Sequence, residues 1–147
     1  MRILLQRVTR AAVSVDGTTR GAIDDGLVAL VGIGPGDDDE TVTTLAGKCV
    51  DLRIFRDEEG RTNRSLADVG GAMLIVSQFT LFGDTRRGRR PSFIGAAPPE
   101  LADRLVDVFA DAVAARGVTI ARGVFGAEME VELVNDGPMT IWLDSAS

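Results

Sequence analysis

The sequence contains no histidine and no tyrosine among its 147 residues. Without an imidazole group, the chain cannot carry a Ser-His-Asp or Cys-His catalytic arrangement, and it offers no histidine ligand for a metal. If the protein is an enzyme, its acid–base chemistry falls to carboxylates, lysine, a hydroxyl group, the backbone or the substrate itself. This absence therefore restricts the reaction types that the chain can perform.

Cysteine and long apolar runs are also scarce. Cys49 is the only cysteine, which excludes an intrachain disulfide and a cysteine-based zinc site and fits a reducing compartment. No apolar run approaches the ~20 residues of a membrane span, and the first residues lack a secretory signal pattern. We expect a single domain, residues 1–147, in the cytoplasm, without a membrane contact, a metal or a cofactor.

The most informative stretch lies in the middle of the chain. Five apolar residues, Ala72 to Val76, follow a Gly-Gly turn and predict a buried strand. Three polar residues, Ser77, Gln78 and Thr80, then follow directly. Polar side chains at this place must be paired inside the protein, hydrated at a strand end, or directed at a ligand. The pattern alone supports a strand that runs into solvent and a ligand site equally well.

The remaining pattern predicts strands around two main helices. The helices are expected near residues 37–52 and 98–117, and Cys49 falls on the apolar stripe of the first, where we expect an inert core thiol. Strands are expected at residues 3–8, 11–15, 20–23, 27–33, 72–76, 129–133 and 139–143. Because most strands are joined by tight turns, we expect an α+β fold with a mostly antiparallel, partly closed, barrel-like sheet.

Arginine is concentrated in one loop of an acidic chain. Arg86, Arg87, Arg89 and Arg90 occupy four of five positions, although the net charge is −6. Such a loop can hold phosphate locally. The overall charge disfavours a long duplex, whereas contact with a few phosphates at one end of a nucleic acid fits the pattern. The alternative is a solubilising loop whose arginines pair with nearby acids.

The segment Asn135-Asp136-Gly137-Pro138 predicts a turn between the last two strands. Two properties of Gly137-Pro138 permit more than a turn. X–Pro bonds are the only peptide bonds with an appreciable cis population, and glycine lacks the Cβ that would keep another molecule at a distance. The pair could therefore form a rigid projection of backbone oxygen acceptors.

Two separated motifs together resemble the D-aminoacyl-tRNA deacylase family. They are residues 77–81 (Ser-Gln-Phe-Thr-Leu) and residues 135–140 (Asn-Asp-Gly-Pro-Met-Thr), with support from residues 6–8 (Gln-Arg-Val) and 90–93 (Arg-Pro-Ser-Phe). The likeness runs in order over essentially the whole chain. Met139 departs from the family pattern, which usually has valine or another apolar residue there. We expect this change to alter packing and to leave the backbone chemistry in place.

The resemblance implies a homodimer that hydrolyses the ester of a tRNA whose 3′-terminal adenosine carries a D-amino acid or glycine. In that picture Gly137, cis Pro138 and Met139 of one subunit reach the pocket of the other. Ser77, Gln78, Phe79 and Thr80 line this pocket, and no cofactor is needed. The L esters are rejected because their side chain would meet backbone. The arginines at 86, 87, 89 and 90 would contact phosphates of the acceptor end.

The chemistry of such a reaction is compatible with the missing histidine. An aminoacyl ester is already activated, so orientation and oxyanion stabilisation matter more than a strong base. Backbone N–H groups of Phe79 and Thr80 are the expected oxyanion donors, and Gln78 could orient water or the ester. Thr80 as a nucleophile in a hydrolase of another activated ester remains an alternative, as does a non-catalytic module that binds RNA ends.

Overall fold

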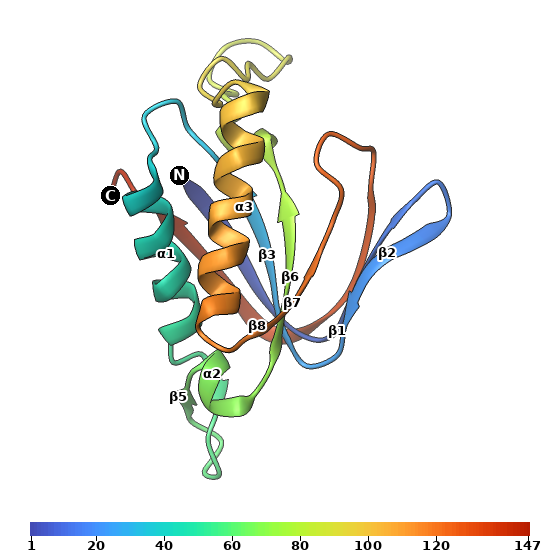
Figure 1. Ribbon diagram of the computed structural model, residues 1–147, viewed down its shortest axis with the longest axis vertical. Helices are drawn as coiled ribbons and strands as arrows, with labels where there is room; N and C mark the ends of the chain where they lie inside the picture. Colours follow the sequence, from blue (N-terminus) through green and yellow to red (C-terminus); the bar gives the residue numbers. More distant parts are fainter.

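The fold is organised around one long strand, β1 (Arg2–Val15). The computed structural model describes residues 1–147 (Figure 1). On one side β1 pairs antiparallel with β3 (Gly26–Gly32) and then with β2 (Thr18–Ile23). On its other side it pairs along most of its length with β8 (Glu130–Asp144). The two strands expected at 3–8 and 11–15 are therefore one, because β8 spans both halves.

The sheet is mixed. The central strand β6 (Ala72–Ser77) runs parallel to β3, and β7 (Thr119–Arg122) runs parallel to β6. The strand order is β2-β1-β3-β6-β7, with β8 on β1. The expected antiparallel pairing holds around β1 but is wrong for these three strands. Long crossovers through helices return the chain to the same end of the sheet, which produces parallel neighbours. A separate hairpin pairs β4 (Phe55–Arg56) with β5 (Thr62–Arg64).

The sheet curls until its two outer strands, β2 and β7, nearly meet. This confirms the partly closed, barrel-like sheet that the sequence predicted. A Cβ placed on Gly21 of β2 would lie only 2.8 Å from the carbonyl oxygen of Arg122 on β7. The inside of this curl is filled by a small apolar core. Its buried members are Val8, Ala11, Val13, Ile23, Val28, Leu74 and Val76.

Two long helices cover the opposite face of the sheet, α1 (Asp39–Asp51) and α3 (Pro99–Ala115), and lie side by side in Figure 1. The side chain of Asp38 caps α1 by accepting the N–H of Thr41 (2.9 Å). The main core lies between helices and sheet and includes Cys49, whose thiol pKa burial raises to about 12. The inert core thiol is thus confirmed. A short helix, α2 (Leu66–Val69), was not predicted. None of the helices combines the length and apolarity that crossing a membrane requires.

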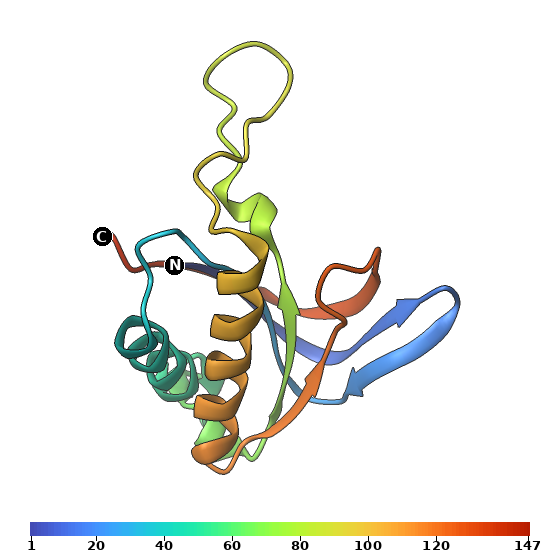
Figure 2. The same cartoon turned by 45° about the horizontal axis from the view of Figure 1, so that its top comes forward.

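The connection from β6 to α3 carries most of the features singled out in the sequence. It begins with a 3₁₀ helix, η1 (Phe79–Phe82), and continues into the arginine loop, residues 84–92. Two backbone hydrogen bonds between Asp84 and Ser92 close the base of this loop, at 2.7 and 2.9 Å. Above that base the loop projects alone from the body of the molecule (Figure 2).

Candidate active site

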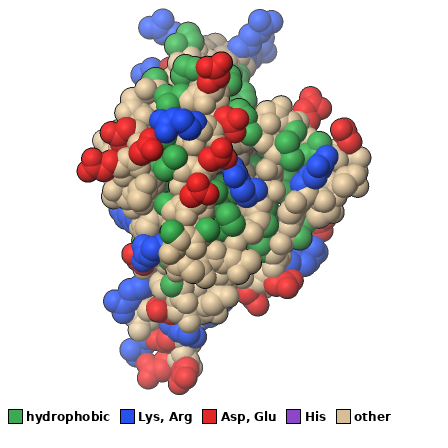
Figure 3. Space-filling model, viewed as in Figure 1, with side chains coloured by type: hydrophobic (Ala, Val, Ile, Leu, Met, Phe, Trp, Pro, Cys, Tyr) green, Lys and Arg blue, Asp and Glu red, His purple; other side chains and the backbone are tan.

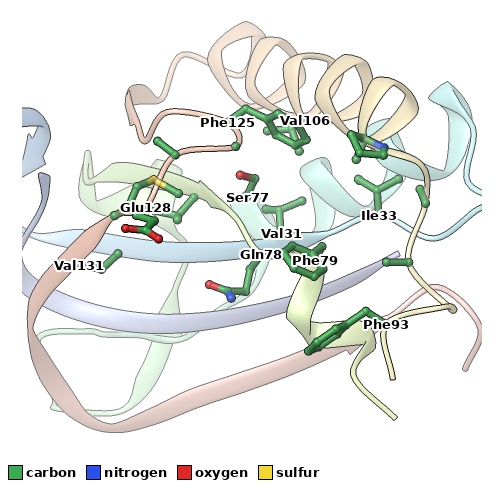
Figure 4. Close-up of a pocket in the computed structure, with 18 residues that line it drawn as sticks. Val31, Ile33, Ser77, Gln78, Phe79, Phe93, Val106, Phe125, Glu128 and Val131 are labelled. Atoms are coloured by element: carbon green, nitrogen blue, oxygen red, sulfur yellow. The ribbon is translucent and has the colours of Figure 1, made fainter. Parts of the chain in front are cut away.

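A cavity of about 630 Å³ lies where the three parallel strands end. The ends of β3 and β6 form its floor, α3 forms one wall, and the segment 125–131 after β7 forms another (Figure 4). Carboxyl ends of parallel strands gather the loops that follow them, which makes this edge a common ligand site. The lining residues are mostly apolar, and Glu128 is the only ionisable one.

The polar run after the central strand lies at this cavity. Ser77, Gln78 and Phe79 line it, and the N–H of Gln78 donates to the carbonyl oxygen of Val31 (2.8 Å). Phe79 is 56% exposed. Thr80 is exposed and does not line the cavity, but its hydroxyl accepts a hydrogen bond from the Gln78 amide. The structure thus brings the four residues predicted from sequence together, three on the wall and the fourth beside it.

The start of η1 supplies free backbone donors. The first N–H groups of a 3₁₀ helix, here those of Phe79 and Thr80, have no acceptor within the helix. Gln78 precedes them and makes no capping hydrogen bond to either. The hydroxyl of Thr80 has an amide as its hydrogen-bond partner and no carboxylate or lysine. This arrangement can stabilise a negative oxygen, whereas it does not activate the threonine as a nucleophile.

Arg2 ties the other end of η1 to the sheet. Its guanidinium donates to the carbonyl oxygen of Leu81 (2.9 Å) and lies 4.5 Å from the ring centroid of Phe82. The same group pairs with Asp144 on β8 (3.3 Å) and lies 6.0 Å from the ring of Trp142. Sequence reasoning did not identify Arg2, because an arginine near the start of a strand has no distinguishing pattern.

The predicted turn at residues 135–138 is instead a bulge within a continuous strand. β8 pairs with β1 on both sides of it, from Val8 opposite Asn135 to Gln6 opposite Thr140. The residues between these pairs leave the ladder, and we call residues 135–139 the Gly-Pro bulge. The peptide bond before Pro138 is cis. Gly137 and Pro138 are exposed, and neither they nor Met139 line the cavity of their own chain.

A buried arginine holds the Gly-Pro bulge from below. Arg7 is only 3% exposed, and its guanidinium donates to the carbonyl oxygens of Asp136 (3.0 Å) and Ile54 (2.6 Å). The amide nitrogen of Asn135 donates to the carbonyl oxygens of Arg7 (3.0 Å) and Met139 (3.3 Å). The bulge therefore keeps its shape through bonds to its own backbone carbonyls.

A second arginine fixes the bulge from the side. Arg56 on β4 donates to both carboxylate oxygens of Asp136, at 3.0 and 2.8 Å. This hydrogen bonding, together with the nearby charge of Arg7, lowers the pKa of Asp136. Sequence reasoning noted Arg7 only as a flank of the motif and missed Arg56, whose partner lies 80 residues away in the chain.

The arginine loop lies just beyond the cavity and forms the blue groups at the top of Figure 3. Arg86 pairs with Asp84 (2.7 Å) and lowers the pKa of that carboxyl to about 2. Arg87, Arg89 and Arg90 are exposed, and no acidic side chain pairs with them. The alternative of a loop neutralised by nearby acids thus holds for Arg86 alone.

The cavity wall opposite η1 was also missed. It consists of α3 residues such as Val106 and of the segment after β7, in which Phe125 faces the cavity (Figure 4) and Met129 also lines it. These apolar residues carry the same sequence signal as core residues. Only the position of the segment directly after a parallel strand could have singled them out.

Comparisons with known proteins identify the family. Residues 4–144 match the family model described as D-Tyr-tRNA(Tyr) deacylase. The chain is 61% identical over 146 residues to a D-aminoacyl-tRNA deacylase of Thermomicrobium roseum, covering 99% of this chain and 95% of that protein. It is 58% identical over 144 residues to the D-aminoacyl-tRNA deacylase of Dinoroseobacter shibae, covering 98% and 99%.

Solved structures share the fold over nearly the whole chain. One described as c-Myc DNA Unwinding Element Binding Protein superposes with a TM-score of 0.91 at 37% identity, covering 98% of both chains. A probable eukaryotic D-amino acid tRNA deacylase superposes with a TM-score of 0.84 at 20% identity, which concerns the fold alone. From the family match and the full-length relatives, the chain belongs to the D-Tyr-tRNA(Tyr) deacylase family.

Proposed function

We propose that this protein hydrolyses the ester bond of D-aminoacyl-tRNA and releases free tRNA and the D-amino acid. The family membership supports the substrate class. The observation that carries the chemistry is the start of η1, where two free N–H groups lie beside a cavity with no histidine or lysine. Its volume of about 630 Å³ is that of a small-molecule site and suits a terminal nucleoside.

The reaction needs little from the side chains. Water attacks the ester carbonyl, the bond to the 3′-oxygen of the tRNA breaks, and that oxygen takes up the proton. The N–H groups of Phe79 and Thr80 stabilise the oxyanion, and Gln78 orients the water or the ester. The neighbouring 2′-hydroxyl of the tRNA assists the proton transfer. Direct attack by water is favoured over an acyl-threonine because Thr80 has no base as its hydrogen-bond partner.

A second copy of the chain completes the site in this proposal. β8 pairs only with β1, so its outer edge has no partner within the chain. Val134 and Trp142 on this strand are exposed, Trp142 by 50%. A long free edge with apolar side chains favours pairing with another chain. Association through this edge brings the exposed Gly-Pro bulge of one copy to Phe79 at the cavity mouth of the other.

The Gly-Pro bulge then selects the D over the L configuration at the Cα of the amino acid. Backbone oxygens of Gly137 and Pro138 of the partner subunit hold the α-ammonium group, while the ester carbonyl lies on η1. Of the two remaining directions at Cα, one is open and the other meets backbone. A D side chain takes the open direction, an L side chain collides, and glycine passes the filter. Such a filter tolerates many D side chains, because it works by exclusion.

The free arginines of the arginine loop contact phosphates near the acceptor end. Arg87, Arg89 and Arg90 have no acidic partner, and the loop that carries them projects from the body of the molecule (Figure 2). Phosphate contacts of this kind position a nucleic acid without reading its bases. The loop therefore contributes affinity that is the same for many tRNAs.

The direct test compares two substrates that differ only in the configuration at the Cα of the amino acid. The same tRNA is charged with the D form or the L form of one amino acid, and loss of the ester is followed with and without protein. We expect rapid loss of the D ester and loss of the L ester at its spontaneous rate. Equal loss of both forms, or of neither, contradicts the proposal, and the second outcome leaves only an RNA-binding role.

Thr80→Ala separates the two mechanisms. If water attacks directly, the variant retains most of its activity on the D ester. If Thr80 forms an acyl-enzyme, activity disappears, and the protein is a threonine-dependent esterase.

The shared site can be tested by mixing two inactive variants. Gly137→Ala disturbs the bulge, and Ala127→Trp fills the cavity that Ala127 lines. Neither variant alone is expected to be active. After the two are unfolded together and refolded, mixed dimers contain one site with both wild-type parts, so about a quarter of the sites recover. No recovery, in dimers shown to be mixed, means that the site lies within one chain.

A further inference from the structure

Two apolar side chains lie exposed between the arginine loop and α3. Phe93 is 39% exposed and Ile94 is 92% exposed. Phe93 lines the cavity, whereas Ile94, the next residue, lies outside it. The two residues form what we call the Phe93–Ile94 surface, which starts at the cavity mouth and leads away from it.

The Phe93–Ile94 surface is held in place by its surroundings. The Phe93 ring packs edge-on against Phe79, with ring centroids 5.2 Å apart and planes at 74°. A Cβ on Gly83 would lie 3.1 Å from the same ring, so Phe93 also rests on the backbone there. The N–H of Ala97 donates to the carbonyl oxygen of Ile33 on the cavity floor (2.9 Å). The Phe93 part of the surface is therefore formed before any ligand binds, and the exposed Ile94 follows it directly in the chain.

The neighbouring charges indicate what covers this surface. Arg89 and Arg90 are separated from it in the chain only by Pro91 and Ser92, and no acidic side chain pairs with them, although the protein carries a net charge of −6. An apolar surface beside free guanidinium groups matches a strand of nucleic acid, which presents flat bases and negative phosphates together. An apolar peptide would leave the arginines without a counterpart.

We infer that the Phe93–Ile94 surface stacks against the base of the penultimate nucleotide of the tRNA. The inference rests on the proposed function, since it requires the terminal nucleoside in the cavity. A strand that leaves the cavity past Phe93 brings its next base to Ile94 and its phosphates toward Arg89 and Arg90. Because stacking on an apolar side chain uses the face of a base, the contact tolerates any base at this position.

The test uses binding of uncharged tRNA, so that it does not depend on hydrolysis. Wild-type protein, Ile94→Ser and Ile94→Leu are each titrated with fluorescently labelled tRNA that is intact or that lacks the base of the penultimate nucleotide. We expect Ile94→Ser and the loss of the base each to weaken binding on the order of fivefold. Combined, they should weaken binding no further than either alone, and Ile94→Leu should bind like the wild type.

The outcomes separate this inference from the proposed function. If Ile94→Ser binds tRNA with the affinity of the wild type, the inference is wrong. It is also wrong if loss of the penultimate base weakens binding by the same factor in the wild type and in Ile94→Ser, because Ile94 and that base then do not touch. The slope of affinity against salt should be equal in Ile94→Ser and wild type, since no charge changes. If the protein fails to hydrolyse the D ester, the proposed function is contradicted instead. The binding results can still be interpreted in that case, because they are measured with uncharged tRNA.

Discussion

The Gly-Pro bulge and the arginine loop are both exposed projections, but they are built in opposite ways. The bulge is held by Arg7 and Arg56 and by the amide of its own Asn135, and its Asp136 carboxylate is bonded to Arg56. The arginine loop is bonded at its base, between Asp84 and Ser92, while three of its arginines are free. One region presents fixed backbone and the other presents unpaired charge.

This difference matches the tasks proposed for them. Selection by shape requires that the backbone atoms of the bulge are fixed within a fraction of an ångström, because a small displacement of these atoms would admit the L ester. Attraction of phosphates works over a longer distance and tolerates movement of the side chains. Ion pairs therefore fix the Gly-Pro bulge, where geometry matters, and three arginines of the loop are left without acidic partners, where affinity matters.

The largest effect is expected from loss of the buried brace. Arg7→Met leaves the carbonyl oxygens of Asp136 and Ile54 without their donor, and we expect the free energy of unfolding to fall by about 3 kcal/mol. Denaturation in urea measures this change. Arg10→Met is the matched control, because Arg10 lies on the same strand but pairs with Glu132 in solvent, where a loss below ~1 kcal/mol is expected. If Arg7→Met and Arg10→Met lose the same free energy of unfolding, Arg7 does not hold the Gly-Pro bulge more firmly than an exposed ion pair would.

A second variant alters the shape of the bulge and leaves its charges in place. A Cβ on Gly137 would lie 2.7 Å from the side-chain oxygen of Asn135, whose amide is committed to two carbonyl groups. We expect Gly137→Ala to lower kcat/KM for the D ester roughly a hundredfold. Gly36→Ala is the control, since nothing lies within 4 Å of a Cβ there. Full activity of Gly137→Ala would mean that the exact shape of the bulge is unimportant.

Removing the free charges should affect binding and leave stability unchanged. For the combined change of Arg87, Arg89 and Arg90 to Gln, we expect tRNA affinity at ~0.1 M salt to fall roughly tenfold and the salt slope to decrease by about 2. Titrations at several salt concentrations measure both. Changing Arg20, Arg61 and Arg64 to Gln gives the same net charge elsewhere on the surface. If that control weakens binding equally, the effect belongs to total charge.

The smallest effect concerns pH. The pKa of Asp136 is lowered by the Arg56 hydrogen bond, so its ionised form stabilises the fold above the unfolded value of about 3.9. That contribution is lost as the pH falls through the lowered value, and solvent screening keeps it below ~1 kcal/mol. The stability difference between wild type and Asp136→Asn should be constant above about pH 5 and shrink below it. A difference that grows on acidification would contradict this pairing.

The parts of the fold that could be predicted are those with local signals. The cap at Asp38, the stripe of α1 and the apolar run of β6 all carry their information within a few residues. The parallel neighbours of β6 and the continuity of β8 could not be read in this way. Both depend on which distant segment lies alongside, and a glycine and a proline within a strand look locally like a turn.

The site shows the same division. Ser77 to Thr80 stood out because polar residues interrupt an apolar strand; Ser77, Gln78 and Phe79 line the cavity, and Thr80 lies beside it, bonded to Gln78. The apolar wall formed by Val106, Phe125 and Met129 could not be told from core. Arg56 could not be linked to Asp136, because the two lie 80 residues apart. In the proposed function the two halves of the site come from two chains, and the sequence of one chain carries no local signal for such a contact.

Trp142 gives the molecule an intrinsic optical label. It is the only tryptophan, there is no tyrosine to add background emission, and its half-exposed indole sits on the unpaired edge of β8. Emission excited near 295 nm therefore arises from one place, and it should shift to shorter wavelength when that edge is covered. If two copies associate through this edge as proposed, dilution of the unlabelled protein would yield the dissociation constant of the dimer directly from the emission wavelength.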